Sequence, residues 1–303
     1  TDVIKQCRGL VFNNDKLVMQ GFPYTEEYVL INDDVPLGES NEFSKNWTFF
    51  DSQEGTCLRM FNFNGEWYLS TNRKLKAFNS RWGSSETFGD LFINALDMEY
   101  EKFVNSKLNP DYQYMFLLRS THKNRIVCDA PCDSDPLLYH VGTFKGPGTL
   151  IDNSVDIGIA RPIELKFGSR MELETYVSEV NYRKTQGVIC FSTTKNQQIK
   201  ILNPLYNDAY QIRGNQASIN FRYLQLRREM NPNKLQAFFD LYPDNQEMFR
   251  TYEDILKRAA SFIYHSYIDR YIKKLFVSVP QEEYTVMREC HQWHRLDMTR
   301  NKI

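Results

Sequence analysis

The sequence predicts an α+β fold in which a sheet-rich part, residues 1–213, precedes a helical part, residues 214–303. Two observations favour this division. Three segments of the first part have the pattern of β-hairpins, in which apolar runs flank a short polar turn. After residue 215, apolar residues recur at helical spacing instead. At 303 residues, the chain is long enough for about two domains that each bury a core.

The clearest hairpin spans residues 56–71 and turns at Asn64-Gly65. Asn-Gly between apolar runs is a strong hairpin signal, because both central residues of a type I′ turn need positive φ. Further hairpins are expected over residues 112–129 and residues 187–202. Together they predict antiparallel sheets that pack on each other or on helices.

Two helices are expected to interrupt these sheets. Residues 86–107 place their Phe and Leu side chains on one helical stripe. Ser169 and Glu172 have the spacing of a capping box, which predicts a helix that starts there and reaches about Arg183.

The second part is expected to be almost entirely helical. Residues 221–230 and residues 234–242 suit two short helices, each ended by a Pro-containing segment. A long amphipathic face then runs from Tyr252 to Leu275, and Pro280 begins the last helix.

Composition excludes several classes of protein. The net charge of −1 excludes a globally basic nucleic-acid coat, although a local basic groove remains compatible with it. No run approaches 18 consecutive apolar residues, so we expect no membrane span, and the start lacks the apolar stretch of a signal peptide. Six scattered cysteines do not form a disulfide framework, and they favour a reducing cytosol.

A metal centre is not expected. Cys128 and Cys132, together with His122 and His140, fit no familiar zinc spacing. His291 and His294 could share a helix face, but no third ligand is evident near them. We therefore predict no metal and no other cofactor.

Five short motifs of the first part occur in a fixed order: Cys7-Arg8-Gly9-Leu10-Val11-Phe12, Glu54-Gly55-Thr56 with the hairpin after it, Asn124-Arg125-Ile126-Val127, Gln186-Gly187-Val188-Ile189, and Gln198-Ile199-Lys200. In this order they resemble the covalent nucleotidyltransferase superfamily, above all the phage-type RNA ligases. Polynucleotide ligases and mRNA capping guanylyltransferases belong to the same superfamily. The resemblance implies a ligase-like domain over residues 1–213, and the helical part resembles the tails of ligase-like proteins of large DNA viruses.

The sequence departs from this superfamily at its charged catalytic positions. The family forms a lysyl–nucleotide bond, but alignment on Glu54-Gly55 places Ser52 at the position of the lysine. The acidic positions fall near Leu118 and at Gln186, and the first lysine of the last motif is Gln198. Because a Mg²⁺ site needs carboxylates, these exchanges predict a pocket that has lost its chemistry.

The resemblance implies which residues would bind a nucleotide. Arg8, Arg73 and Lys200 would line the phosphate side, and Arg59 and Lys74 are further candidates. An Arg side chain can pair with two phosphate oxygens at once. The alternative interpretation makes Arg59 and Lys74 solvated surface charges.

Aromatic residues near the same motifs could stack on a base. Trp67, Trp82 and Phe61 are the candidates, and Glu54 could accept hydrogen bonds from a guanine edge. A positively charged methylguanine would gain a cation–π interaction on such a ring. The alternative is that Trp67 and Phe61 belong to the core of a hairpin.

The leading hypothesis is a catalytically silent protein that binds the 5′ end of an RNA as an mRNA cap reader. In a virus, such a reader would act in the host cytoplasm on translation initiation, and the Tyr-rich helical part would dock a protein partner. Two alternatives remain open. The chain could be an active ATP-dependent RNA ligase whose nucleophile lies elsewhere, or a scaffold that kept the fold without a ligand.

Overall fold

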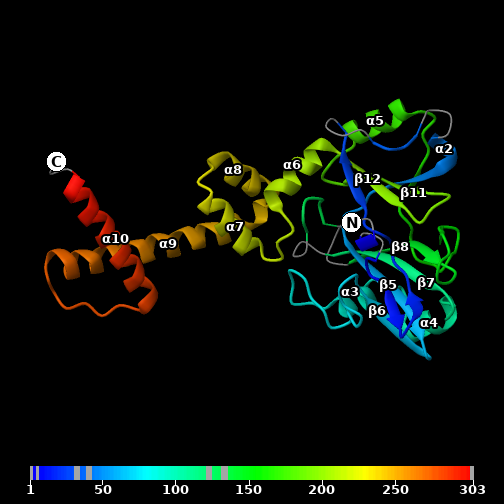
Figure 1. Cartoon of the computed structure of the whole chain (residues 1–303), viewed down its shortest axis with the longest axis horizontal. Coiled ribbons are helices and arrows are strands. Elements are labelled where there is room, and N and C mark those ends of the chain that lie inside the picture. The colour runs from blue at the N-terminus through cyan, green and yellow to red at the C-terminus, as the bar shows by residue number, and fades with distance from the viewer. Residues whose placement is uncertain are drawn as a thin grey trace. The chain divides into compact units, whose positions relative to one another are not determined.

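The computed structural model describes residues 3–4, 7–30, 35–38, 43–120, 125–130 and 136–300. It confirms the predicted α+β class, with antiparallel sheets and flanking helices followed by further helices (Figure 1). The chain divides into two compact units, Thr1–Phe238 and Phe239–Ile303. The domain boundary expected after residue 213 stays a prediction.

Two five-stranded sheets form the body of the first unit. The first sheet has the order β10 (Glu164–Leu165), β4 (Trp47–Asp51), β11 (Gly187–Ser192), β12 (Gln198–Leu202) and β3 (Glu26–Val29). The second has the order β6 (Glu66–Ser70), β5 (Thr56–Phe63), β7 (Gln113–Arg119), β8 (Leu137–Phe144) and β9 (Ile151–Asp152). A separate ribbon pairs β1 (Val11–Asn13) with β2 (Lys16–Met19). Neighbouring strands are antiparallel except β12 and β3, which are parallel.

The structure confirms two of the three predicted hairpins. Strands β5 and β6 turn at Asn64 and Gly65, whose φ angles are 54° and 83°, as a type I′ turn requires. Strands β11 and β12 form the other. The hairpin over residues 112–129 is wrong, because β7 pairs with β5 and β8, and residues 125–130 form no strand. The turn expected there, at residues 122–124, lies outside the described residues.

Each sheet buries one face against helices. In the second sheet, Leu58 and Phe116 belong to a core that includes Phe92 of α3 (Phe88–Asn94) and Phe103 of α4 (Tyr100–Lys107). In the first sheet, Val188 packs in a core with Leu173 and Val177 of α5 (Arg170–Glu179). Because side chains alternate along a strand, every second side chain of these strands points away from the helices, toward the opposite face of its sheet.

The helices differ from expectation in their ends. The stripe over residues 86–107 is split into α3 and α4, and Thr87 and Asp90 form a capping box that begins α3. Ser169 caps α5 by accepting from the Glu172 amide, but this helix ends at Glu179 rather than near Arg183. The sequence analysis missed α6 (Pro204–Arg213), which follows β12 directly and is capped by Asn203.

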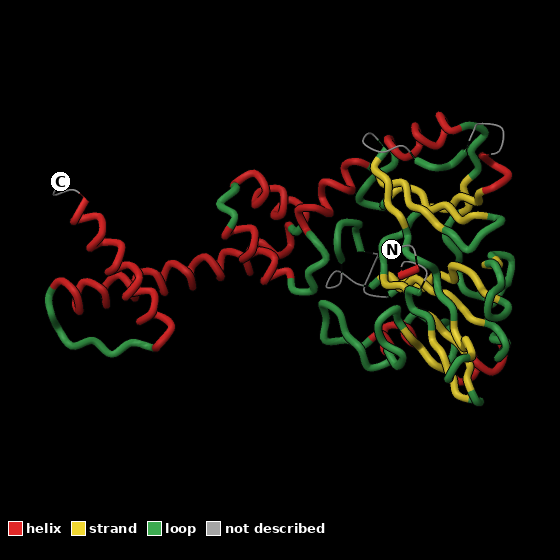
Figure 2. The backbone as a smooth tube through the Cα atoms, viewed as in Figure 1, coloured by secondary structure: helices red, strands yellow, loops and turns green. Residues whose placement is uncertain are grey.

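After α6, the described chain contains only helices and loops (Figure 2). These helices are α7 (Ile219–Arg228), α8 (Pro232–Leu241), η2 (Pro243–Asn245), α9 (Gln246–Tyr267), η3 (Ile268–Ile272) and α10 (Gln281–Arg300). Within the second unit, Tyr271 stacks on His291 of α10 with ring centroids 4.0 Å apart. Among the described residues, no helix has the length and apolar character needed to span a membrane.

Candidate nucleotide-binding site

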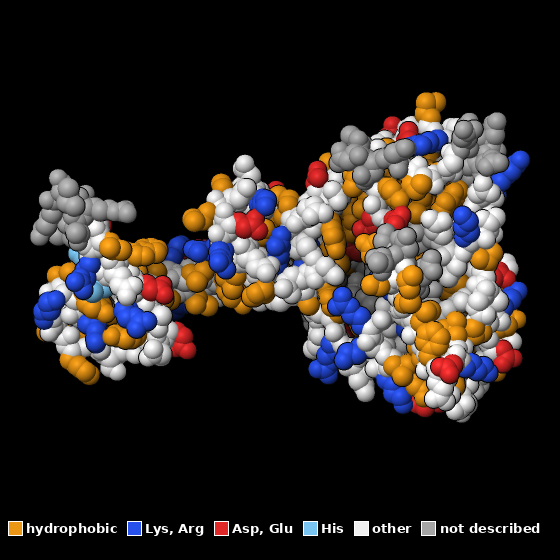
Figure 3. Space-filling view, in the orientation of Figure 1, with side chains coloured by type: hydrophobic (Ala, Val, Ile, Leu, Met, Phe, Trp, Pro, Cys, Tyr) orange, Lys and Arg blue, Asp and Glu red, His pale blue; other side chains and the backbone are white. Residues whose placement is uncertain are grey.

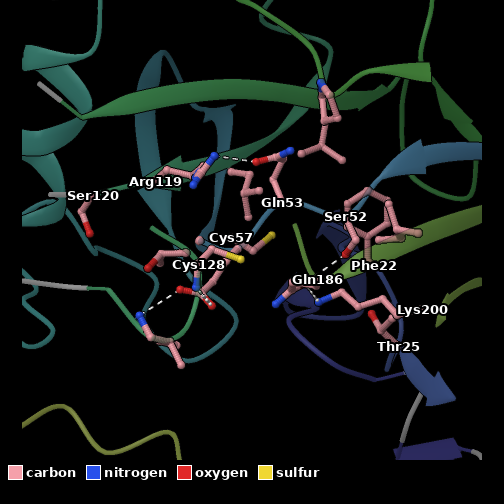
Figure 4. Close-up of a pocket in the computed structure, with 18 of the residues that line it drawn as sticks. Phe22, Thr25, Ser52, Gln53, Cys57, Arg119, Ser120, Cys128, Gln186 and Lys200 are labelled. Atoms are coloured by element: carbon pink, nitrogen blue, oxygen red, sulfur yellow. Dashed lines mark hydrogen bonds between the residues drawn. The ribbon is translucent and has the colours of Figure 1, made fainter. Parts of the chain in front are cut away.

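A cavity of about 490 Å³ lies between the two sheets of the first unit. Its walls come from β4, β11 and β12 on one side and from β5, β7 and β8 on the other (Figure 4). This volume is within the range of about 300–1,000 Å³ that small-ligand sites occupy. The described lining carries five basic residues, Arg8, Arg73, Arg119, Arg125 and Lys200, and three acidic ones, Asp51, Glu54 and Asp129.

The pleat of the first sheet determines which residues reach the cavity. Phe50, Ile189 and Lys200 lie opposite one another in register, and all three line the cavity. Their neighbours along the strands, such as Cys190 and Ile199, belong to the core beneath α5. A shift of one residue would exchange these two faces, so the register of β4, β11 and β12 positions the site.

A buried hydrogen-bond network runs along one side of the cavity. The Ser52 hydroxyl donates to the Gln186 side-chain oxygen at 3.0 Å, and the Lys200 ammonium donates to the same oxygen at 2.8 Å (Figure 4). The Gln186 amide nitrogen donates to the Tyr206 hydroxyl at 2.7 Å. Two of the positions predicted to have lost their charges, Ser52 and Gln186, therefore remain hydrogen-bonded to one another.

The network ends at Glu54, which is almost fully buried. Its carboxylate accepts from the Tyr206 hydroxyl at 3.1 Å and from the backbone amides of Ile126, Val127 and Cys128 at 2.8–3.2 Å. Burial, and then the nearby Glu54 carboxylate, raise the pKa of the Tyr206 hydroxyl, so this hydroxyl stays protonated and can donate. These protein contacts occupy Glu54, so we assign it to positioning the segment 126–128 rather than to a guanine edge.

The basic residues of the cavity differ in how they are held. Arg119 donates to the Gln53 side-chain oxygen at 2.6 Å and to the Asp129 carbonyl at 2.9 Å. Arg125 is buried and donates to the Cys128 carbonyl at 3.0 Å. Arg8 and Arg73 are exposed at the cavity and form no ion pair within the part of the chain that the structure describes. They are thus available to phosphate oxygens, and Arg119 is a cation that the sequence analysis missed.

Arg59 does not line the cavity, which corrects its assignment to phosphate binding. Its side chain is 2% exposed. The guanidinium donates to the Gly9 carbonyl and, at 2.7 Å, to the Thr71 carbonyl. Burial lowers the pKa of this guanidinium. Arg59 therefore ties the N-terminal segment and the end of β6 to β5. Lys74 is exposed and also lies outside the residues that line the cavity.

Of the three predicted stacking rings, only Trp82 lines the cavity. Phe61 is buried in a core with Met19 and Met115 and stacks on Tyr68. Trp67 and Trp82 both pack in part against the core beneath α3 and α4, but Trp67 is not among the residues that line the cavity. The alternative interpretation of Phe61 and Trp67 as hairpin core is therefore the one that fits their surroundings.

The sequence analysis missed other aromatic rings of the cavity, namely Phe22, Phe50, Phe88 and Phe191. Phe191 contacts both Phe22 and Phe50, with ring centroids 5.4 and 5.8 Å apart. The alternating pattern of β4 and β11 is the signal that could have identified Phe50 and Phe191, once Ser52 and Lys200 had marked the cavity face.

The residues present do not fit a divalent cation. Leu118 is buried in the core, and its neighbours in β7, Leu117 and Arg119, line the cavity instead. The acid expected near this position is therefore replaced by a cation. Gln198 lines the cavity, and its amide nitrogen donates to the Thr25 hydroxyl. No three carboxylate, histidine or cysteine side chains gather at one point among the described residues.

The Cys and His residues considered for zinc do not change this picture. Cys132 and His122 lie outside the described residues. His140 is buried and hydrogen-bonds through Nε2 to the Thr143 hydroxyl at 2.8 Å. Burial, and then nearby Arg161, lower the pKa of His140 to about 4. Burial raises the pKa of the Cys57 thiol in the cavity wall, so this thiol is not an activated nucleophile.

No family model matches the chain. The chain is similar to proteins of two iridoviruses, both named as homologues of immediate-early protein ICP-46. The protein of Invertebrate iridescent virus 6 is 28% identical over 97% of this chain and 69% of its own length. That of Invertebrate iridescent virus 3 is 28% identical over 91% and 63%. The chain thus spans about two thirds of the length of these relatives.

A relative from the baculovirus Autographa californica nuclear polyhedrosis virus is named as a candidate bifunctional polynucleotide kinase/RNA ligase. It is 26% identical over 46% of this chain and 21% of its own length. This likeness agrees with the predicted resemblance to viral RNA ligases, whereas the names of the two ICP-46 homologues state no activity.

Solved structures similar to this chain include ligases. A candidate ATP-dependent DNA ligase from Aquifex aeolicus covers 94% of this chain and 78% of its own, with 12% identity and a TM-score of 0.49. An archaeal ATP-dependent RNA ligase covers 77% and 69%, with 11% identity and a TM-score of 0.44.

Proposed function

We propose that this protein is a catalytically silent relative of nucleotidyltransferases that binds the 5′ end of an RNA and reads an mRNA cap. The proposal combines two properties of the cavity. It has the volume and the cations to bind a nucleotide, and its described lining has Ser52 and Gln186 where the family has its lysine and an acid.

The observation that carries the proposal is the arrangement of Ser52, Gln186 and Lys200. Nucleotidyl transfer through serine needs a base that takes the hydroxyl proton. The Ser52 hydroxyl instead donates to the neutral amide oxygen of Gln186, whose other donor is the Lys200 ammonium. An ammonium has no lone pair with which to accept a proton, so Lys200 in this form can stabilise a bound phosphate but cannot serve as that base.

The same cavity supports binding of a charged nucleotide. Arg8, Arg73 and Lys200 provide cations for phosphate oxygens, and Trp82 provides a flat ring. A methylated guanine carries a positive charge that an indole face attracts, so the cap would bind Trp82 more tightly than an unmethylated base does. Stacking on such a ring contributes about 1–3 kcal/mol.

The viral relatives support the wider context of this proposal. A cap reader of a virus would work in the host cytoplasm and influence translation initiation. The second unit would then contact a protein partner, for which it offers exposed apolar residues such as Phe276 and Trp293, 92% and 74% exposed.

An active RNA ligase is the second candidate, because the baculovirus relative carries that name and because Lys200 places an amine in the cavity. Incubation with radiolabelled ATP or GTP and Mg²⁺ or Mn²⁺, followed by denaturing electrophoresis, separates the two. The proposal predicts no labelled protein, and retention of capped RNA on the immobilised chain. An acid-labile adduct on a lysine, with Lys200 as the first to map, would overturn it. Retention of neither capped RNA nor nucleotide would favour a scaffold.

A further inference from the structure

The connection between β6 and α3 is strongly basic. Residues 71–82 contain four basic side chains, Arg73, Lys74, Lys76 and Arg81, and no acidic ones. We name these residues the basic loop. All four cations are exposed, and Lys76 pairs with Glu66 at 3.0 Å. The other three form no ion pair within the described ranges, although Arg81 is near enough to Asp90 of α3 to add to the lowering of its carboxyl pKa by hydrogen bonds from Thr87. The charges of Arg73 and Lys74 in particular are thus not neutralised by the protein.

The backbone of the basic loop is well anchored. The Thr71 hydroxyl accepts from the amides of Arg73 and Lys74, and the Thr71 amide donates to the Lys74 carbonyl at 2.9 Å. Ala77 is fully buried, and its amide donates to the Leu69 carbonyl.

The far end of the loop is fixed as tightly. Phe78 packs so closely on Gly89 of α3 that a Cβ atom there would lie 2.2 Å from its ring. The Phe88 amide donates to the Ser80 carbonyl at 2.8 Å. The cations therefore project from a fixed backbone, which lowers the conformational cost of binding an extended anion.

The basic loop begins and ends at the cavity. Arg73 and Trp82 line it, whereas Lys74 and Arg81 are exposed outside its lining. Figure 3 shows Lys and Arg side chains gathered where Figure 1 places this connection. A polyanion whose terminal group occupies the cavity would thus continue across Lys74 and Arg81, two exposed cations that form no ion pair within the described ranges.

We infer that the basic loop binds the phosphodiester backbone of the RNA nucleotides that follow the one in the cavity. The inference rests on the proposed function and extends it from the terminal nucleotide to the chain behind it. Exposed Lys and Arg bind phosphates without reading bases, so this contact adds affinity for any RNA sequence. It also makes binding depend on salt, because each neutralised phosphate releases counterions.

The experiment compares two probes on the full chain, 7-methyl-GTP and a capped 12-nucleotide oligouridylate, by fluorescence titration at several salt concentrations. The unmodified protein binds the oligonucleotide more tightly. The double variant Lys74→Gln/Arg81→Gln loses affinity for the oligonucleotide on the order of tenfold, and its salt slope falls by about 0.7 for each lost phosphate contact. Its affinity for 7-methyl-GTP is unchanged. Lys102→Gln/Lys107→Gln, which removes two exposed cations of α4, is the matched control and changes neither.

Three results overturn the inference while the proposed function stands. The first is that the oligonucleotide binds to the unmodified protein no more tightly than 7-methyl-GTP does. The second is that the double variant loses the same affinity for both probes. The third is that the double variant loses as much affinity for polyglutamate, used as a third probe, as for the oligonucleotide. The last result would assign the loop to an acidic protein surface. Failure of either probe to bind the unmodified protein would instead refute the proposed function itself.

Discussion

Replacing Glu54 by Gln tests whether this buried carboxylate organises the cavity. In the protein, its two oxygens accept hydrogen bonds from three backbone amides and from the Tyr206 hydroxyl. An amide side chain retains one acceptor oxygen and turns an NH₂ group toward these donors. At least one backbone N–H of residues 126–128 then stays buried without an acceptor, and the charge that strengthens the other bonds is lost.

The magnitude follows from these contacts. Hydrogen bonds to a charged group contribute about 1.5–3 kcal/mol each, so Glu54→Gln should destabilise the protein by about 3–5 kcal/mol. For a unit of this size, 1 kcal/mol corresponds to about 2–4 °C in Tm, so we expect a fall on the order of 10 °C. Thermal unfolding followed by far-UV circular dichroism measures it.

The matched control is Glu66→Gln, the same chemical change at a side chain that pairs with Lys76 on the surface. Its Tm should stay at that of the unmodified protein, because exposed ion pairs contribute little. If Glu54→Gln unfolds at the same temperature as this control, the carboxylate does not hold segment 126–128, and Glu54 would again be open to a role in binding a base.

Three further predictions concern binding and pH. The cavity cations to be replaced by alanine, one at a time, are Arg8, Arg73 and Lys200. Each replacement should weaken binding of a capped oligonucleotide by about 1–3 kcal/mol in a titration. Unchanged affinity in all three variants would place the phosphates elsewhere. Trp82→Ala should abolish any preference for 7-methyl-GTP over GTP, whereas Trp67→Ala should lower Tm and leave that preference intact. Burial holds the pKa of His140 near 4, below its unfolded value of about 6.5, so between these values the unfolded chain binds more protons and stability falls as the pH decreases. His140→Gln should flatten Tm against pH over this window, and an unchanged slope would assign the acid sensitivity to another group.

The sequence predicted those parts of the fold that depend on local chemistry. The hairpin at Asn64-Gly65 and the cap at Ser169 both follow from residues a few positions apart. The partner of β7 could not be predicted in the same way. Strand β8 begins at Leu137, 18 residues beyond the end of β7, and no turn signal marks a connection of that length. Local pattern therefore predicts pairing of β7 with the nearest segment, residues 125–129, instead of with β8.

The site was predicted to the extent that motif order marks the cavity. Ser52 follows β4, Gln186 precedes β11 and Lys200 lies in the middle of β12, and all three line the cavity at positions that the resemblance aligns. Arg59 and Phe61 occupy the same strand face as Cys57, which does line the cavity. Arg59 and Phe61 do not reach the cavity because the N-terminal segment packs over this part of β5. The Gly9 carbonyl of that segment accepts a hydrogen bond from the Arg59 guanidinium. The alternation of side chains along a strand predicts on which face of the sheet a residue lies, but it does not predict which other segment packs on that face.

The neutral residues of the cavity bear on the choice between a binding protein and a scaffold. A site that had lost its ligand would be free to fill with apolar side chains, which are often at least as stable as buried polar ones. Here Ser52, Gln186 and Tyr206 instead form a continuous hydrogen-bond network between Lys200 and Glu54. Such a network holds Lys200 at a defined place in an otherwise open cavity, and it is costly unless nearly all of its members are satisfied. A cation held in place beside neutral residues, with no base for Ser52, suits the binding of a nucleotide but not its transfer. This favours the proposed reader over the ligase, and the retained network favours it over the scaffold.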